Sequence, residues 1–120
     1  MKAKEEFIGS TILNVEGAEK DSEEIVFTTT NGTFKMYHEQ DCCETVTVDD
    51  IIGADYLIGS VVLDFIEKVD DTMDAKGSYN EESHTWTFYT IRTSKGYTDI
   101  KWYGESNGYY SERVDFQKVD

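Results

Sequence analysis

Residues 25–38 read IVFTTTNGTFKMYH and give the clearest indication of the architecture. Two runs rich in β-branched and aromatic residues flank the pair Asn31-Gly32. An Asn-Gly pair in this setting predicts a β-hairpin with a type I′ turn, because that turn needs positive φ at two successive residues. We therefore expect two antiparallel strands here.

Further strands are expected on both sides of this hairpin. Lys95-Gly96 separates residues 85–93 from 97–103, and Asn107-Gly108 separates the latter from 109–116, which predicts a second meander of three strands. Residues 7–15, 44–48 and 61–69 are also expected to be strands. Between the last two, Asp49 is expected to cap one short helix that ends at a glycine. The sequence thus predicts a mainly β protein, an antiparallel meander or curled sheet of seven or eight strands with one short helix.

The length of 120 residues predicts a single domain, residues 1–120, because two domains of about 60 residues would each bury too little surface. No apolar run approaches the length of a membrane span, and the first residues do not read as a secretion signal. We therefore expect a monomer in the cytoplasm, with no membrane contact.

The charge is strongly negative and unevenly distributed. The chain has 25 acidic and 11 basic residues, a net charge of −14, and residues 39–82 hold 13 of the acidic but only 2 of the basic ones. This balance argues against direct binding of nucleic acid, which relies on Lys and Arg. The acidic region is either a solvated face or a surface attracted to a basic partner. Its candidate contact residues, with two tyrosines of the aromatic stretch 102–111, are Asp64, Glu67, Asp70, Asp71, Asp74, Tyr103 and Tyr109.

Alternation along the strands predicts which side chains are buried. His38 shares a face with Phe34 and Met36, and His84 shares a face with Trp86 and Phe88. We expect both histidines to lie at strand ends, on faces that carry large apolar side chains. Trp86 and Phe88 would then belong to the core.

The stretch His38-Glu39-Gln40-Asp41-Cys42-Cys43-Glu44 is the strongest candidate for chemistry. Zinc selects imidazole and thiolate ligands, and a His-x3-Cys spacing brings them within reach in a tight turn. His84 is the only other histidine, and the neighbouring carboxylates are further candidate ligands. Two alternatives remain open: the cysteines are small buried apolar residues, or one is a nucleophile with a histidine as base. The acidic surroundings argue against the nucleophile, because they raise a thiol pKa.

This stretch, together with residues 49–59 and 102–111, resembles a family of short phage and prophage proteins over roughly residues 8–117. Its most specific part is the His-x-x-Asp-Cys-Cys-Glu signature, and the sequence departs from the family pattern at Ala54-Asp55-Tyr56. The chain also resembles the streptococcal type II-A anti-CRISPR inhibitors. The resemblance implies a structural zinc held by His38, Cys42 and Cys43, with His84 or an acidic neighbour completing the site.

The resemblance also implies a function. We expect a phage-encoded, non-enzymatic inhibitor that binds the type II RNA-guided effector nuclease of a bacterium and blocks target DNA loading or cleavage. One alternative is a small zinc hydrolase with Glu39 or Glu44 as general base. Another is a phage accessory protein that binds a different host factor.

Overall fold

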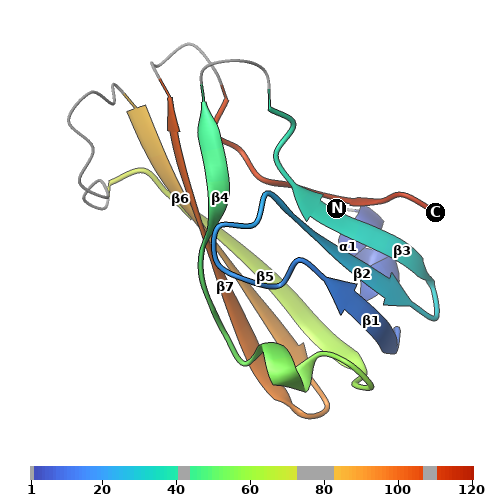
Figure 1. Cartoon of the computed structure of the whole chain (residues 1–120). Helices are drawn as coiled ribbons and strands as arrows, with labels where there is room; N and C mark the ends of the chain where they lie inside the picture. The colour runs from blue at the N-terminus through green and yellow to red at the C-terminus, as the bar shows by residue number, and fades with distance from the viewer. Residues whose placement is uncertain (1, 41–43, 73–82, 107–110) are drawn as a thin grey trace.

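The computed structural model describes residues 2–40, 44–72, 83–106 and 111–120, which form two four-stranded antiparallel sheets packed face to face (Figure 1). One sheet has the strand order β1-β2-β3-β8 and the other the order β4-β7-β6-β5. The elements are α1 (Lys2–Phe7), β1 (Ile12–Glu16), β2 (Glu24–Thr29), β3 (Gly32–Tyr37), β4 (Thr45–Ile52), the 3-10 turn η1 (Ala54–Tyr56), β5 (Val62–Asp70), β6 (Ser83–Thr93), β7 (Gly96–Ser106) and β8 (Asp115–Lys118).

The predicted fold class is confirmed: the chain is mainly β, with antiparallel strands and little helix. The short helical segment after β4 is the 3-10 turn η1, but Gly53 precedes it in a left-handed conformation and Asp49 lies within β4. The prediction of a strand from residue 7 is wrong at its start, because residues 2–7 form the helix α1. In the part of the chain that the structure describes, no helix is long and apolar enough to cross a membrane.

Two hairpins share one construction, which differs from the predicted type I′ turn. The β2–β3 hairpin pairs Thr29 with Gly32, and the β6–β7 hairpin pairs Thr93 with Gly96. In each, the threonine hydroxyl donates to the glycine carbonyl, at 2.9 Å in both cases. Asn31 has no positive φ, whereas Gly32 has a φ of 121°. Glycine suits this position for a second reason, because a Cβ there would lie 2.5 Å from the Asp120 carbonyl oxygen. Thr30 and Asn31 are the two turn residues, so the Asn-Gly pair spans the end of the turn and the first residue of β3.

The predicted second meander is wrong at its third strand. β8 pairs with β3 in the other sheet and not with β7, so the chain changes sheets between β7 and β8. Asn107 and Gly108, on which that prediction rested, lie outside the described residues. The crossover brings the segment before β8 next to the end of β3, where Arg113 contacts His38.

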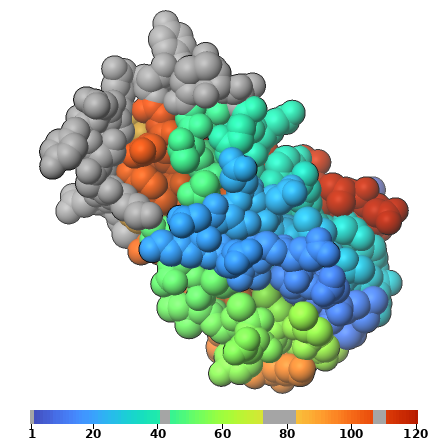
Figure 2. All heavy atoms as spheres, in the orientation of Figure 1, coloured from blue at the N-terminus to red at the C-terminus, as the bar shows by residue number. Residues whose placement is uncertain are grey.

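Backbone hydrogen bonds join the two sheets at their edges. Val48 of the edge strand β4 exchanges bonds with Asp21 and Ser22, and Val62 of the edge strand β5 exchanges bonds with Gly9 and Ser10. Figure 2 shows the resulting contact, with the N-terminal segment lying across residues 45–65. The region of β5 beyond Val62 pairs only with β6 among the described strands.

Phe7 connects α1 to the core between the sheets. Its fully buried ring lies 5.1–5.5 Å, centroid to centroid, from those of four other phenylalanines, three on one sheet and one on the other: Phe27, Phe34, Phe116 and Phe65. Trp102 adds a link between the sheets, because its indole N–H donates to the Met36 sulfur at 3.1 Å. The filled interior leaves the outer sheet faces and the strand ends as places for function.

Candidate functional site

The outer face of the β4-β7-β6-β5 sheet carries an unusual number of aromatic and apolar side chains. Strand register defines this face, because its residues alternate with the core residues Phe65, Tyr89, Ile91, Ile100 and Trp102. We call it the outer sheet face. It includes Asp50, Ile52, Asp64, Ile66, Lys68, Asp70, Trp86, Phe88, Thr90, Tyr97, Asp99, Lys101 and Tyr103.

This assignment corrects one prediction. Trp86, Phe88 and His84 do share a face, but it is the outer sheet face and not the core. The core side of β6 carries Tyr89 and Ile91 instead. The exposed apolar side chains Ile52 and Ile66, at 64% and 50% exposure, lie on the same outer face. Ile52 and Ile66 lie on the two edge strands, with Asp99 and Thr90 between them in the register, so the exposed apolar side chains of this face alternate with polar ones.

A packed aromatic centre stiffens the outer sheet face. Trp86 and Tyr103 are cross-strand partners, and their ring centroids are 4.5 Å apart. The Lys101 ammonium lies 4.6 Å from the Trp86 ring centroid, within the range of a cation–π interaction. His84 stacks on the other side, with its ring centroid 6.3 Å from that of Tyr103. Both Trp86 and Tyr103 are more than nine-tenths buried, so Tyr103 supports the surface without being an exposed contact.

Beside this centre lies a shallow groove of about 280 Å³. Ile52 and Phe88 give it apolar walls, and Asp50, Asp99 and Lys101 give it charged ones. Thr90 donates to Asp99 at 2.8 Å, which holds that carboxylate in place. The groove has the size and mixed polarity to accept one protruding side chain of a partner.

The predicted acidic contact residues divide between locations. Asp64 and Asp70 lie on the outer sheet face, opposite Arg92 and Trp86 of β6. Asp71 is exposed just after β5. Glu67 points to the other face of β5, where it accepts a hydrogen bond from the Tyr89 hydroxyl at 2.6 Å. Asp74 and Tyr109 lie outside the described residues.

Sequence reasoning missed Ile52, Ile66 and Phe88 as surface residues. The available signal was the succession of large residues in β6 and β7, where Phe88 precedes Tyr89 and Trp102 precedes Tyr103. Successive residues of a strand point to opposite faces, so such pairs indicate apolar side chains on both faces of the sheet.

A second candidate site surrounds His38 at the end of the sandwich where β3 ends and β4 begins. The His38 side chain is 4% exposed, and its Nδ1 donates to the Arg113 carbonyl oxygen at 2.6 Å. The other ring nitrogen, Nε2, is buried and makes no hydrogen bond within the described structure. It faces Glu44, whose Oε2 is 3.7 Å away and whose side chain is 1% exposed. A buried polar atom without a partner costs about 1–3 kcal/mol, so this nitrogen needs an explanation.

The structure does not bring His84 to this place. Thr85 of β6 points inward, where its hydroxyl donates to Glu112, so the adjacent His84 points to the outer sheet face. Cys42 and Cys43 lie outside the described residues. Among the described residues, no three His, Cys, Asp or Glu side chains converge as a metal site would require.

Glu112 is the other buried carboxylate of this end of the sandwich. Thr85 donates to its Oε1 at 2.7 Å and Ser106 to its Oε2 at 2.6 Å. Gly104 makes room for it, because a Cβ at that position would lie 2.9 Å from the Glu112 Cβ. Glu112 therefore has hydroxyl partners on both oxygens, which explains its burial without any ligand.

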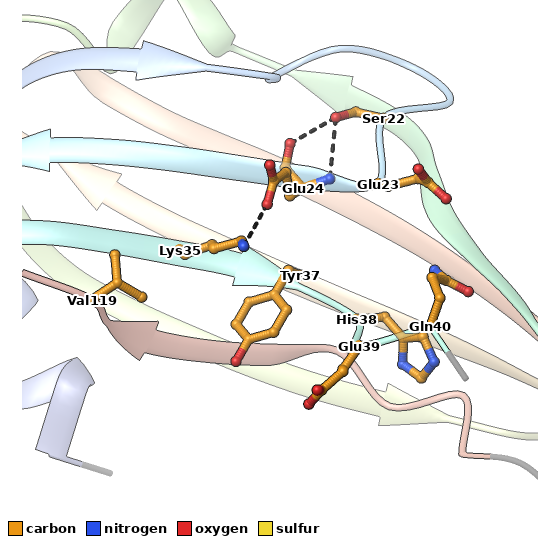
Figure 3. A pocket seen from close by; sticks show the side chains of 9 residues that line it. All are labelled: Ser22, Glu23, Glu24, Lys35, Tyr37, His38, Glu39, Gln40 and Val119. Atoms are coloured by element: carbon orange, nitrogen blue, oxygen red, sulfur yellow. Dashed lines mark hydrogen bonds and ion pairs between the residues drawn. The ribbon is translucent and has the colours of Figure 1, made fainter.

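A larger groove of about 630 Å³ lies on the other sheet, over β2 and β3 (Figure 3). Glu24 and Lys35 form an ion pair across it at 2.7 Å, and Lys35 also lies 4.8 Å from the Tyr37 ring centroid. The hydrogen bond to Glu24 raises the pKa of Lys35 above its ordinary value. The dashed lines in Figure 3 join Ser22 to Glu24 and Glu24 to Lys35, so these three residues of the groove pair with one another.

Comparison with known proteins gives one family. The family model described as "Domain of unknown function (DUF7448)" matches residues 5–116. No curated protein and no solved structure is significantly similar to the chain.

Proposed function

The chain belongs to the DUF7448 family, a domain of unknown function, and we propose from its own surfaces that it is a non-enzymatic protein that binds and inhibits a basic partner. The outer sheet face carries this proposal. It combines exposed apolar side chains, a rigid aromatic centre and a rim of aspartates on one side of a small β-sandwich.

Electrostatic attraction supports a basic partner. A net charge of −14 on 120 residues creates a field that attracts positively charged surfaces and repels nucleic acid. Asp64 and Asp70 place part of that charge on the outer sheet face itself, and the exposed Asp71 follows directly. Such charges speed association and select the partner, and their effect weakens as salt is added.

Apolar contacts would supply the affinity. Ile52 and Ile66 are at least half exposed, and Ile52 also lines the groove beside Phe88. Large apolar side chains on a stiff surface are typical anchors of protein interfaces, because little conformational entropy is lost when they bind. A sheet with large apolar side chains on both faces makes a small domain less soluble. Their presence on the outer face therefore favours a binding role for that face.

The proposed partner is the type II RNA-guided effector nuclease of a bacterium. Such a nuclease holds its guide–target heteroduplex in a positively charged channel, and an acidic protein in that channel would exclude DNA or prevent the change that licenses cleavage. The resemblance of residues 38–44 and 102–111 to phage proteins and type II-A inhibitors supports this choice. The inhibitor would act in the bacterial cytoplasm as a monomer, and a structural zinc would stabilise it.

The test is a titration of the purified effector–guide complex with the full chain, read by calorimetry and by cleavage of a matched target DNA. We expect saturable binding and loss of cleavage at the same stoichiometry. Absence of binding would overturn the proposal and leave a different host factor as the partner. Cleavage of the effector itself, or turnover at sub-stoichiometric amounts, would contradict the non-enzymatic mode and favour a hydrolase.

A further inference from the structure

We propose that two copies of the free chain pair through the edge strand β5, antiparallel about Ile66, and join their β4-β7-β6-β5 sheets into one continuous sheet. The inference concerns the chain without its partner, so it goes beyond the proposed function, which describes an inhibitor that acts as a monomer. It rests on the backbone of β5 and on the charges that this strand carries.

The first step concerns the backbone groups at the edge. In an antiparallel pair, alternate residues of a strand form hydrogen bonds to its neighbour. The Ser94 N–H donates to the Val61 carbonyl oxygen, so the backbone groups at even-numbered positions of β6 face β5. Through the strand register, the backbone groups of Phe65, Glu67 and Val69 then point away from β6. No second described strand pairs with β5, and such an open edge readily pairs with a strand of another chain.

The second step concerns how much of this edge is open. The backbone of Val62 already bonds to the N-terminal segment, and β5 ends at Asp70. The open span is therefore residues 63–69, which is centred on Ile66. Residues 66–69 are all exposed although successive side chains point to opposite faces, so the described part of the chain covers neither face there.

The third step concerns the side chains that face each other in this pairing. A two-fold axis at Ile66 places Asp64 opposite Lys68 of the second copy, twice, and Leu63 opposite Val69. Within one copy, Asp64 and Lys68 are about 13 Å apart along the strand, too far to form an ion pair. A lysine on an edge strand usually opposes pairing, but here the second copy supplies its counter-charge. Opposite charges and apolar side chains in such cross-strand positions stabilise antiparallel strands.

The pattern is specific to this register and to this strand. A centre one residue earlier would place Lys68 opposite Val62, where the edge is occupied. A centre one residue later would place Asp64 opposite Asp70, and like charges in that position are destabilising. Among the other described edge strands, β1 and β4 carry only acidic charges and β8 has four residues. A second copy is therefore the occupant that β5 fits.

The experiment is sedimentation equilibrium of the full chain in about 0.15 M salt, which screens the repulsion between two chains of net charge −14. We expect a reversible dimer to form between about 10 μM and 1 mM, the weak range of association. No larger species should form, because a two-fold pairing is closed. The amide hydrogen exchange of Glu67 and Val69 should slow as the concentration rises.

Asp64→Lys and Lys68→Asp each replace both opposite-charge pairs by like-charge pairs and should weaken the dimer by about tenfold or more. An equimolar mixture of these two variants restores both pairs, so it should dimerise more tightly than either variant alone. Both variants keep a negative net charge, so overall charge does not attract one to the other. Glu19→Lys and Lys20→Asp, in the exposed segment after β1, make the same charge changes and are the matched controls. They should dimerise as the wild type does, with no gain on mixing.

Val69→Pro tests the backbone contact. It removes an N–H that points to the open edge and not to β6, so the variant should keep its fold, checked by thermal unfolding, and lose the dimer. The inference is overturned if the wild type stays monomeric over this concentration range. It is also overturned by a dimer that survives Val69→Pro, or by a mixture that associates no better than its components. All of these measurements are made without the nuclease, so failure here leaves the proposed function to its own test.

Discussion

Trp86 of β6 and Tyr103 of β7 are direct cross-strand partners, and their rings pack 4.5 Å apart on the side of the sheet that faces away from the core. Lys101 lies over the Trp86 ring and ties the pair to the next position of β7. Such cross-strand aromatic pairs stabilise a sheet surface and hold it in one conformation. The outer sheet face is therefore a preorganised surface, which is what a binding role requires.

Ile66→Lys should abolish tight partner binding without loss of fold. Ile66 is 50% exposed on the outer sheet face, so its replacement leaves the core intact and changes the free energy of unfolding by about 0.5 kcal/mol or less. In a complex, the introduced ammonium would be buried against a basic partner, and we expect the affinity to fall by about 100-fold or more. Calorimetric titration of the effector complex, with thermal unfolding in parallel, measures both effects.

Leu13→Lys is the matched control for this variant. Leu13 is 55% exposed, but it belongs to β1 of the other sheet. The same change of charge and apolar area should leave the affinity within about twofold of the wild type, apart from the general effect of one added positive charge. Equal loss of affinity in both variants would show that the outer sheet face is not the contact surface.

Phe7→Ala should be among the most destabilising single substitutions. The Phe7 ring is fully buried and contacts aromatic rings from both sheets, so its removal leaves a cavity between them. Truncation of such a residue costs about 3–5 kcal/mol. Chemical denaturation of the variant measures the change. A cost below about 1 kcal/mol would mean that α1 does not dock on the core as described.

Tyr89→Phe should remove part of the loss of stability at alkaline pH. Burial, and then the hydrogen bond to Glu67, raise the pKa of Tyr89 well above its ordinary value near 10. Above that pH the unfolded chain releases this proton while the folded chain keeps it, so the free energy of unfolding falls as pH rises. The slope from one such group approaches 1.4 kcal/mol per pH unit. The variant lacks this contribution, and we expect its unfolding free energy to decline less steeply above about pH 10.

The same variant makes a second prediction near neutral pH. Loss of the Tyr89 hydroxyl removes its 2.6 Å hydrogen bond to Glu67, whose carboxylate remains accessible to water. The expected cost is therefore about 1 kcal/mol. Parallel curves for wild type and variant between pH 7 and pH 11 would contradict the assignment of the alkaline dependence to Tyr89.

Much of the fold was predictable because its signals are local. Alternating β-branched residues and hairpin glycines placed the strands near their observed positions, and antiparallel pairing of neighbours follows from short connections. The helix α1 was missed because only Phe7 of its six residues is fully buried, so it shows no helical repeat of apolar positions. The pairing of β8 with β3 depends on contacts between residues 78–84 positions apart, which no local pattern encodes.

The turns illustrate a sequence signal that was present but read differently. Thr29-Thr30-Asn31-Gly32 and Thr93-Ser94-Lys95-Gly96 share the pattern Thr-x-x-Gly, and both use the threonine hydroxyl to close the hairpin. The Asn-Gly rule considers only the last two of these four residues in the first hairpin. The repeated pattern predicts both hairpins better than the Asn-Gly rule does.

The candidate sites were predictable in part. The sequence singled out His38 and its neighbours, and it named Glu44 among the carboxylates, but it added His84 because that is the only other histidine of the chain. Which of these residues lie near one another depends on the sheet face that each side chain occupies. A shift of one residue in the strand register moves a side chain to the opposite face. The outer sheet face was obscured for the same reason, since alternation does not say which of two apolar faces is the core.

The most direct test of the proposed inhibitor function compares two triple variants in binding to the effector–guide complex over a range of salt concentrations. One variant removes negative charge from the outer sheet face and from the adjacent Asp71, with Asp64→Asn, Asp70→Asn and Asp71→Asn. The asparagine side-chain oxygens can still accept the hydrogen bonds that Asp64 and Asp70 accept from backbone N–H groups. The other changes the exposed Glu5, Glu16 and Glu19 to Gln, on α1 and around β1. Each removes three of the negative charges.

The proposal predicts that the aspartate variant loses affinity by about tenfold or more at low salt and shows a flatter salt dependence, because local charges dominate steering at a contact. The glutamate variant should bind nearly as the wild type does. Equal loss in the two variants, or no loss in the aspartate variant, would contradict the claim that the acidic outer sheet face binds the nuclease.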